Sequence, residues 1–166
     1  MTGWKEKREK RQWIISGVAA VLLILLYLVI FSYSAQDGET SGNLSIRISE
    51  KCVEILNSVT GKHWTQKVQQ NMAAYFEHPI RKLAHFCEYA CMGVLVYLTT
   101  RPFWKKKKNW YFRILLWVFL SAATDEFHQT FVPDRWGSPA DVLLDTLGGV
   151  FGLVIMRFLN RKKTNV

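Results

Sequence analysis

The sequence predicts an all-α polytopic membrane protein, a bundle of four transmembrane helices. Two observations support this prediction: long apolar runs alternate with short charged segments, and the basic residues gather in those short segments. In a soluble protein, the net charge of +9 would suggest a nucleic-acid partner. Because these charges flank apolar runs, we expect the lipid bilayer as the partner and no nucleic acid.

Four apolar runs have the length of membrane-spanning helices, and together they form a single membrane domain over residues 1–166. The first run, at about residues 13–33, carries no formal charge. It is longer than the apolar core of a signal peptide, so we expect an uncleaved span. The other three runs lie at about residues 83–100, 110–127 and 140–159.

Basic residues in the flanking segments predict how these spans are oriented. Five precede the first span, six lie within residues 101–113, and four lie at or after the end of the fourth span, counted from Arg157 onward. With four spans, these segments fall on one side, which the positive-inside rule identifies as the cytoplasm. We therefore expect both termini in the cytoplasm. The loop between the third and fourth spans, which carries only Arg135, is then outside.

The long outer loop, residues 34–81, is expected to hold two short amphipathic helices. Apolar residues recur at helical spacing on both sides of a break at Thr60-Gly61. The first stripe comprises Leu44, Ile48, Cys52 and Ile55, and the second comprises Val68, Met72 and Tyr75. Such stripes most often mark a buried helix face, so we expect them to pack over the bundle at the outer interface.

The fourth span has a well-marked beginning and a pair of glycines. Ser138 is a good N-cap, Pro139 suits the first helical position, and Asp141 lies in the first turn. Gly148 and Gly152 form a GxxxG pair, which allows a neighbouring helix to approach closely. Packing within the chain is the expected role of this pair, because four spans already supply partners.

Polar and ionisable residues gather at the outer ends of the second, third and fourth spans. Ionisable groups at membrane depth are costly unless they are paired or hydrated, so they usually face an interior cavity. The predicted orientation brings all of them to one outward-facing pocket. They are Arg81, Lys82, His85, Glu88, Tyr89, Asp125, Glu126, Gln129, Arg135, Asp141 and Asp145.

Three interpretations of this group remain open. It is a hydrogen-bonded network that only fixes helix register, a pocket for an anionic head group with Arg81, Lys82 and Arg135 as donors, or a catalytic site. Catalysis would use paired carboxylates with histidine, or a metal ion. The metal ligands would be His85, Glu88, Asp125, Glu126 and His128.

The sequence favours neither a metal ion nor a cofactor. Glu126 and His128 are two residues apart, so a helix places them on different faces. The three cysteines, Cys52, Cys87 and Cys91, form no CxxC pair. A nucleophile elbow, a P-loop and a dinucleotide fingerprint are all absent from the sequence. We therefore expect no metal ion and no cofactor.

Several short motifs together resemble the VanZ family, and they extend from the first span to the last. In chain order they are Phe31-Ser-Tyr-Ser-Ala-Gln36 followed by Ser41, Arg81-Lys82-x-x-His85-x-x-Glu88-Tyr89, Asp125-Glu126-x-x-Gln129-x-Phe131-x-Pro133-x-Arg135, Ser138-x-x-Asp141 and Gly148-Gly149-x-x-Gly152. One departure is Asp134, at a turn position where the family pattern leads us to expect glycine.

The resemblance implies a small bacterial cell-membrane protein linked to low-level resistance to teicoplanin-type glycopeptide antibiotics. Those antibiotics act on cell-wall precursors at the outer face of the membrane. We therefore expect a non-enzymatic role in glycopeptide or lipoglycopeptide tolerance, in which the pocket binds the antibiotic or a lipid-linked cell-wall precursor. The alternative is a membrane enzyme that acts on a lipid head group or cell-wall precursor through a carboxylate–histidine site.

Overall fold

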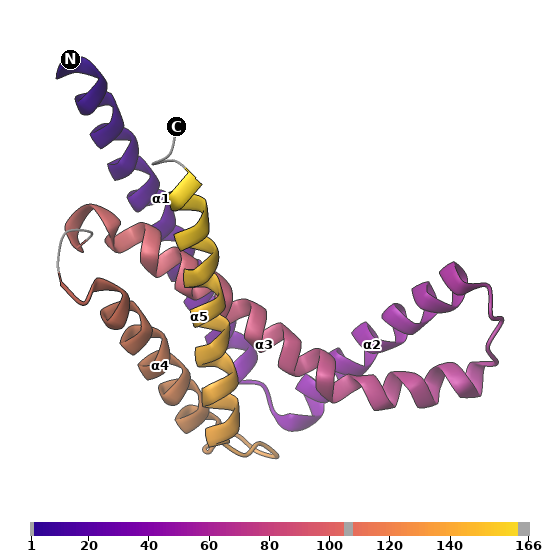
Figure 1. Cartoon of the computed structure of the whole chain (residues 1–166). Coiled ribbons are helices and arrows are strands. Elements are labelled where there is room, and N and C mark those ends of the chain that lie inside the picture. The colour runs from indigo at the N-terminus through magenta and orange to yellow at the C-terminus, as the bar shows by residue number, and fades with distance from the viewer. Residues whose placement is uncertain (1, 105–107, 163–166) are drawn as a thin grey trace.

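The computed structural model describes residues 2–104 and 108–162, and over these residues it contains helices and no strand (Figure 1). The all-helical prediction is therefore confirmed. In chain order the helices are α1 (Thr2–Ser34), α2 (Gly38–Thr60), α3 (Gln66–Trp104), α4 (Trp110–Gln129) and α5 (Pro139–Lys162).

Three helices are long and apolar enough to cross a membrane: α1, α3 and α5. Helix α4 stands where the third span was predicted, but it does not reach the same apolar composition. Its 20 residues include Arg113 near one end and the carboxylates of Asp125 and Glu126 near the other. The described chain thus has the helices of a multi-pass membrane protein, and the count of four spans stays a prediction.

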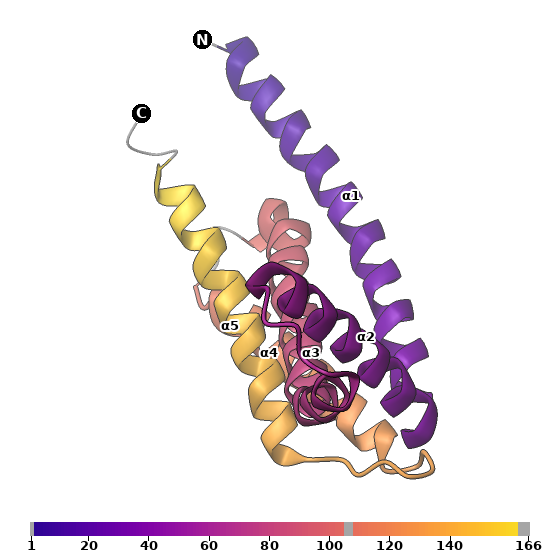
Figure 2. The same cartoon turned by 90° about the vertical axis from the view of Figure 1, so that its right-hand side faces the viewer.

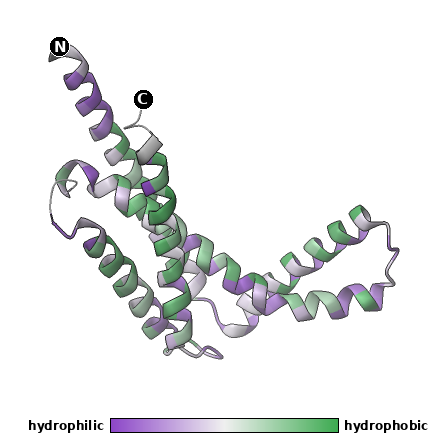
Figure 3. Cartoon of the chain, viewed as in Figure 1, coloured by the Kyte–Doolittle hydropathy of each residue, from purple (hydrophilic) through white to green (hydrophobic). Residues whose placement is uncertain are grey.

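The beginning of α1 and the end of α5 lie at the same end of the bundle (Figures 1 and 2). The α1–α2 link and the α4–α5 loop lie at the opposite end. Purple, hydrophilic residues mark the start of α1, and green, apolar residues dominate the spans that follow (Figure 3). Part of the basic cluster on which the orientation depends, Lys105 to Lys107 and Lys163, lies outside the described residues.

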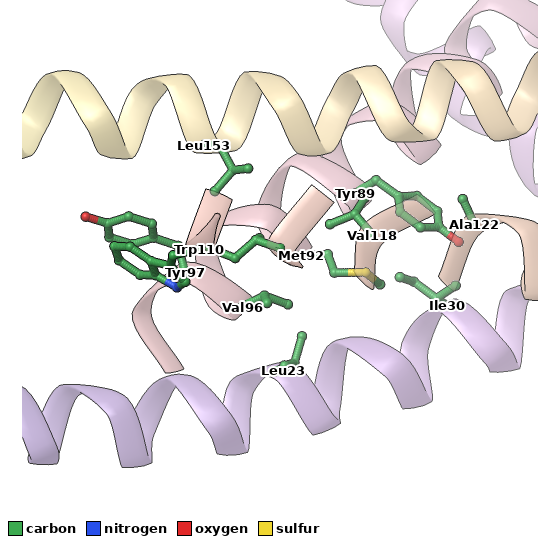
Figure 4. Close-up of a cluster of buried hydrophobic side chains, with 11 residues drawn as sticks. Leu23, Ile30, Tyr89, Met92, Val96, Tyr97, Trp110, Val118, Ala122 and Leu153 are labelled. Carbon is green, nitrogen blue, oxygen red and sulfur yellow. The ribbon is translucent and has the colours of Figure 1, made fainter. Parts of the chain in front are cut away.

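Helix α3 packs against all four other helices, and a buried apolar cluster joins it to α1, α4 and α5 (Figure 4). Residues four apart in α4 point into this cluster, which is the spacing of one helix face. The Tyr97 and Trp110 rings stack with centroids 4.7 Å apart. Trp110 Nε1 also donates to Thr100 Oγ1 at 3.0 Å, which closes the end of the bundle opposite the α4–α5 loop.

Glycine backbones bring α3 and α5 into direct contact. A Cβ atom added at Gly148 or Gly152 would collide with the α3 backbone at Phe86 or Ala90. Gly93 of α3 lies against the backbone of Gly149 in the same way. The prediction that the GxxxG pair packs within the chain is confirmed. This close approach holds together the two helices that carry most of the polar residues discussed below.

The outer segment forms a hairpin that projects sideways from the bundle (Figure 1). Helix α2 ends at Gly61, which has a φ of 63° and donates its N–H to the Asn57 carbonyl. The second amphipathic stretch is not a separate short helix, because it is the first part of the 39-residue α3, which continues through Pro79 into the span. The hairpin is made by α2 and this part of α3.

The apolar stripe of α2 is exposed, so the expectation that it packs over the bundle is wrong. Leu44, Ile48 and Ile55 are 39%, 46% and 63% exposed. A different face is buried, and it carries the small residues Ser45, Ser49 and Val53. Small side chains let α2 and α3 pack closely, and this contact includes a 2.6 Å hydrogen bond from Ser49 Oγ to the Ala73 carbonyl.

Candidate functional site

A polar cavity of about 430 Å³ lies where α3, α4 and α5 meet the α4–α5 loop and the start of α2. Eight of the eleven predicted residues line it: Arg81, Lys82, His85, Glu126, Gln129, Arg135, Asp141 and Asp145. Three segments that are far apart in the sequence therefore meet around one cavity. Their helical positions explain this, because α3 residues 78, 81, 82 and 85 share one helix face.

Burial differs between the mouth and the floor of this cavity. The side chains of Lys82 and Asp141 at the mouth are 36% and 31% exposed, and they form an ion pair between α3 and α5. Glu126 and Asp145 at the floor are only 6% and 1% exposed. The charged groups are therefore partly solvated at the mouth, and the carboxylates at the floor are buried.

The buried carboxylate of Glu126 holds the beginning of α5 in place. Its Oε2 accepts a 2.8 Å hydrogen bond from the backbone N–H of Ser138. Ser138 was predicted as the N-cap of this helix, and its carbonyl accepts from the N–H groups of Asp141 and Val142. Glu126 thereby satisfies a backbone donor beside a helix start, where unpaired N–H groups are costly.

Arg135 ties the α4–α5 loop to the end of α1. Its Nη2 donates to the Tyr33 carbonyl at 3.0 Å. Partial burial lowers the pKa of the guanidinium, with a smaller contribution from the charge of Arg81. A guanidinium remains charged at physiological pH despite such a shift. Arg135 therefore presents a fixed positive charge to the cavity.

The loop beside Arg135 contains a backbone conformation that glycine adopts more easily. Asp134 has a φ of 55°, in the left-handed region. This is the position at which the family pattern suggested glycine. The start of α2 closes against the same loop, because the Gly38 N–H donates to the Pro133 carbonyl at 3.1 Å. A Cβ at Gly38 would collide with the Asp134 carbonyl, so this wall of the cavity depends on glycine.

Three predicted residues do not line the polar cavity: Glu88, Tyr89 and Asp125. Glu88 lies near His85, with 3.9 Å between Oε2 and Nδ1. Tyr89 and Asp125 instead line an apolar groove between α1 and α4. Asp125 accepts a 3.2 Å hydrogen bond from Gln129, which does line the cavity.

The proposed metal ligands are not gathered into one site. His128 lines the α1–α4 groove, where its ring packs on Phe31 with centroids 5.0 Å apart. Among the residues that the structure describes, no group of three or more His, Cys, Asp or Glu side chains is placed to hold a metal ion.

Five further residues line the cavity and were not predicted: Gly38, His78, Asp134, Trp136 and Leu144. His78 was identifiable, because it lies three and seven residues before Arg81 and His85 on the same helix face. Trp136 directly follows Arg135 in the loop. Gly38 gave no local signal, because it reaches the cavity only through the fold of the α1–α2 link.

Comparison with known proteins identifies a family match over most of the chain. The family model described as VanZ/LLP1 matches residues 19–160. This range includes α5 almost to its end and all of the cavity lining. No curated protein and no solved structure matches the chain.

Proposed function

The chain belongs to the VanZ/LLP1 family, and on that premise we propose that its polar cavity binds the head group of a membrane-anchored ligand at the outer face of the cell membrane. The ligand is a lipid-linked cell-wall precursor or a lipoglycopeptide antibiotic of the teicoplanin type. Binding of either ligand would reduce recognition of the precursor by the antibiotic. The protein would thereby contribute to glycopeptide tolerance without catalysing a reaction.

The proposal includes a topology of four spans, with α4 as the third. Helix α4 is buried along the face that carries Trp110, Ile114, Val118 and Ala122, and it packs against α3 and α5. Its other faces expose large apolar residues such as Leu116 and Leu120, which suits contact with lipid. With both termini in the cytoplasm, the cavity opens outward.

The observation that supports binding best is the cavity itself. It has the volume of a typical small-molecule site, and charged side chains converge on it from three helices and a loop. A network that only fixes helix register does not need an open volume of this size. Arg81 and Arg135 are suited to bind carboxylates or phosphates, because a guanidinium offers paired donors to such groups.

Expression in a teicoplanin-sensitive bacterial host tests this proposal. We expect the wild-type chain to raise the minimal inhibitory concentration of teicoplanin, and Arg81→Gln to abolish that rise. The matched control is Glu54→Gln, an exposed charge on α2 away from the cavity. Unchanged susceptibility with the wild-type chain, at a confirmed level in the membrane, would overturn the proposed role.

A second candidate is a membrane enzyme that acts on a lipid head group or cell-wall precursor. The observation that favours it is that His85, Glu126 and Asp145 line the same cavity. Such groups can transfer protons when a substrate lies between them. Purified protein incubated with these lipids would yield a modified product that Glu126→Gln abolishes. Tolerance retained in both Glu126→Gln and Asp125→Asn would exclude this candidate.

A further inference from the structure

The polar cavity carries charges of both signs in nearly equal number. Its lining contains the cations Arg81, Lys82 and Arg135 and the carboxylates Glu126, Asp134, Asp141 and Asp145. A ligand that is only anionic would meet buried carboxylates, and one that is only cationic would meet guanidinium groups. Both arrangements carry a like-charge penalty, which grows as the charges lose water.

The cations at the mouth differ in how far their charge is already compensated. Lys82 is paired with Asp141. Arg81 has a long contact of 3.7 Å with Glu77. Arg135 forms no ion pair within residues 2–104 and 108–162, and its one hydrogen bond goes to a backbone carbonyl. A guanidinium has five N–H donors, so Arg135 retains donors for an anionic group.

The floor presents the opposite requirement. Asp145 is 1% exposed and lines the cavity. Neither of its carboxylate oxygens has a hydrogen-bond partner in the described part of the chain. Nearby Glu126 already accepts from Ser138. A buried carboxylate without a donor is costly, so a ligand that brings a donor or a positive charge to Asp145 gains the most.

We propose that the cavity binds an aminophosphate, a group in which a phosphate is followed by a primary ammonium. The phosphate lies against Arg135 and Arg81 at the mouth, and the ammonium reaches Asp145 at the floor. This inference rests on the part of the proposed function that places a membrane-anchored head group in this cavity, and it adds an aminophosphate lipid to the two ligands named there. Such a ligand also matches the cavity, which has cations at its mouth and the unpaired carboxylate of Asp145 at its floor.

An apolar groove beside the cavity favours a lipid as the source of this group. The groove lies between α4 and α5, has a volume of about 450 Å³, and is lined by Phe119, Phe127 and Leu143. Glu126 lines both the groove and the polar cavity. The groove also reaches Gly137 and Ser138, which follow the cavity residues Arg135 and Trp136 in the loop. A hydrocarbon chain attached to the phosphate at Arg135 can therefore extend into the groove.

Lipid retention by the purified full chain tests the proposal, measured by native mass spectrometry after extraction from vesicles of defined composition. The vesicles contain phosphatidylethanolamine, its N-acetylated derivative, and phosphatidic acid in equal amounts. N-acetylation removes the ammonium and keeps the phosphate. We expect about tenfold stronger retention of phosphatidylethanolamine than of either other lipid, since a charge-assisted hydrogen bond supports a difference of this size. Equal retention of the three lipids by the wild-type protein would overturn the proposal.

Three variants assign the roles within the cavity. Asp145→Asn should bring the retention of phosphatidylethanolamine down to that of its N-acetylated derivative. Arg135→Gln should weaken the retention of all three lipids. The control Glu54→Gln should behave as the wild-type chain. If Asp145→Asn kept the tenfold preference while its unfolding curve matched that of the wild type, Asp145 would not be the ammonium site and the proposal would fail.

Soluble phosphoethanolamine distinguishes the two sources of the group. If it displaces the lipid at millimolar concentration, the head group alone is sufficient. If the lipid preference persists without displacement, the hydrocarbon chain contributes, and the ligand is a lipid. Both results support the aminophosphate chemistry. Equal retention of all lipids, combined with loss of teicoplanin tolerance in Arg81→Gln, would reject the aminophosphate and leave the proposed function standing.

Discussion

Substitution of Gly93 by alanine tests how α3 and α5 hold the cavity together. A Cβ at this position would lie 2.6 Å from the Gly149 carbonyl oxygen and 3.1 Å from its Cα. Both atoms belong to the backbone of α5, so no side chain can rotate away. An ordinary van der Waals contact begins at 3.4 Å, so the two helices would have to separate by roughly 0.8 Å.

This separation sets the expected size of the effect. Forcing an extra methyl into a well-packed contact costs about 1–3 kcal/mol. Alanine gains about 1 kcal/mol over glycine in helix propensity, which offsets part of that cost. We therefore expect Gly93→Ala to lower the free energy of unfolding by up to about 2 kcal/mol, which is at most about a thirtyfold change in the unfolding equilibrium constant.

The assay is unfolding of the detergent-solubilised chain by increasing sodium dodecyl sulfate, followed by tryptophan fluorescence. Gly17→Ala in α1 is the matched control, because a Cβ there meets nothing within 4 Å. The control should be as stable as the wild type or slightly more stable. A Gly93→Ala protein as stable as the Gly17→Ala protein would refute the claim that a backbone contact joins α3 to α5.

Three further predictions concern the outer segments. Asp134→Gly should raise the unfolding free energy by about 0.5–1 kcal/mol, because Asp134 has a positive φ that glycine adopts without strain. Ser49→Ala should cost about 1 kcal/mol and speed amide hydrogen exchange in α2, because Ser49 donates a buried hydrogen bond to Ala73. Hydrogen bonds from Thr40, led by its backbone N–H, lower the pKa of Asp37 below its ordinary 3.8. A group with a lowered folded pKa stabilises the fold above its unfolded pKa, and this stabilisation is lost as pH falls through the folded pKa. The protection factor at the start of α2, which is exchange corrected for its intrinsic pH dependence, should therefore fall below about pH 4 in the wild type and not in Asp37→Asn.

Each of these three predictions has a control variant. Asp134→Ala should not stabilise the chain, since alanine disfavours the same φ; equal stabilisation by both variants would remove the strain argument. Ser58→Ala alters an exposed serine on α2 and should leave exchange unchanged. A protection factor that fell with acid in the Asp37→Asn protein as in the wild type would show that Asp37 is not the titrating group.

The all-helical fold and the polar end of the bundle were predictable from the sequence, because both follow from local patterns, although the boundary between the second outer helix and the following span was not. Helical spacing placed Arg81, Lys82 and His85 on one face of α3. All three side chains line the polar cavity, as this spacing predicts. The glycines at 148 and 152 predicted a close helix contact, although nothing in the sequence indicated that Gly93 would contact the backbone of Gly149.

Properties that depend on tertiary packing were not predictable in this way. Asp125 and Glu126 are neighbours in the sequence, yet they are about 100° apart around a helix. Glu126 therefore lines the polar cavity, whereas Asp125 lines the apolar groove between α1 and α4. The α2 stripe looked like a buried face, but α3 packs on the small residues Ser49 and Val53 instead. Nothing in the local pattern shows which of two possible faces a neighbouring helix will select.

Direct binding to the purified chain in lipid nanodiscs tests the proposal that the polar cavity holds the head group of a membrane-anchored ligand. The measurement is the equilibrium affinity for a fluorescent lipid-linked cell-wall precursor, and for teicoplanin in parallel. We expect saturable binding of one of them, at least tenfold weaker in Arg81→Gln and unchanged in Glu54→Gln. Binding of neither ligand, or equal binding by all three proteins, would contradict the proposal.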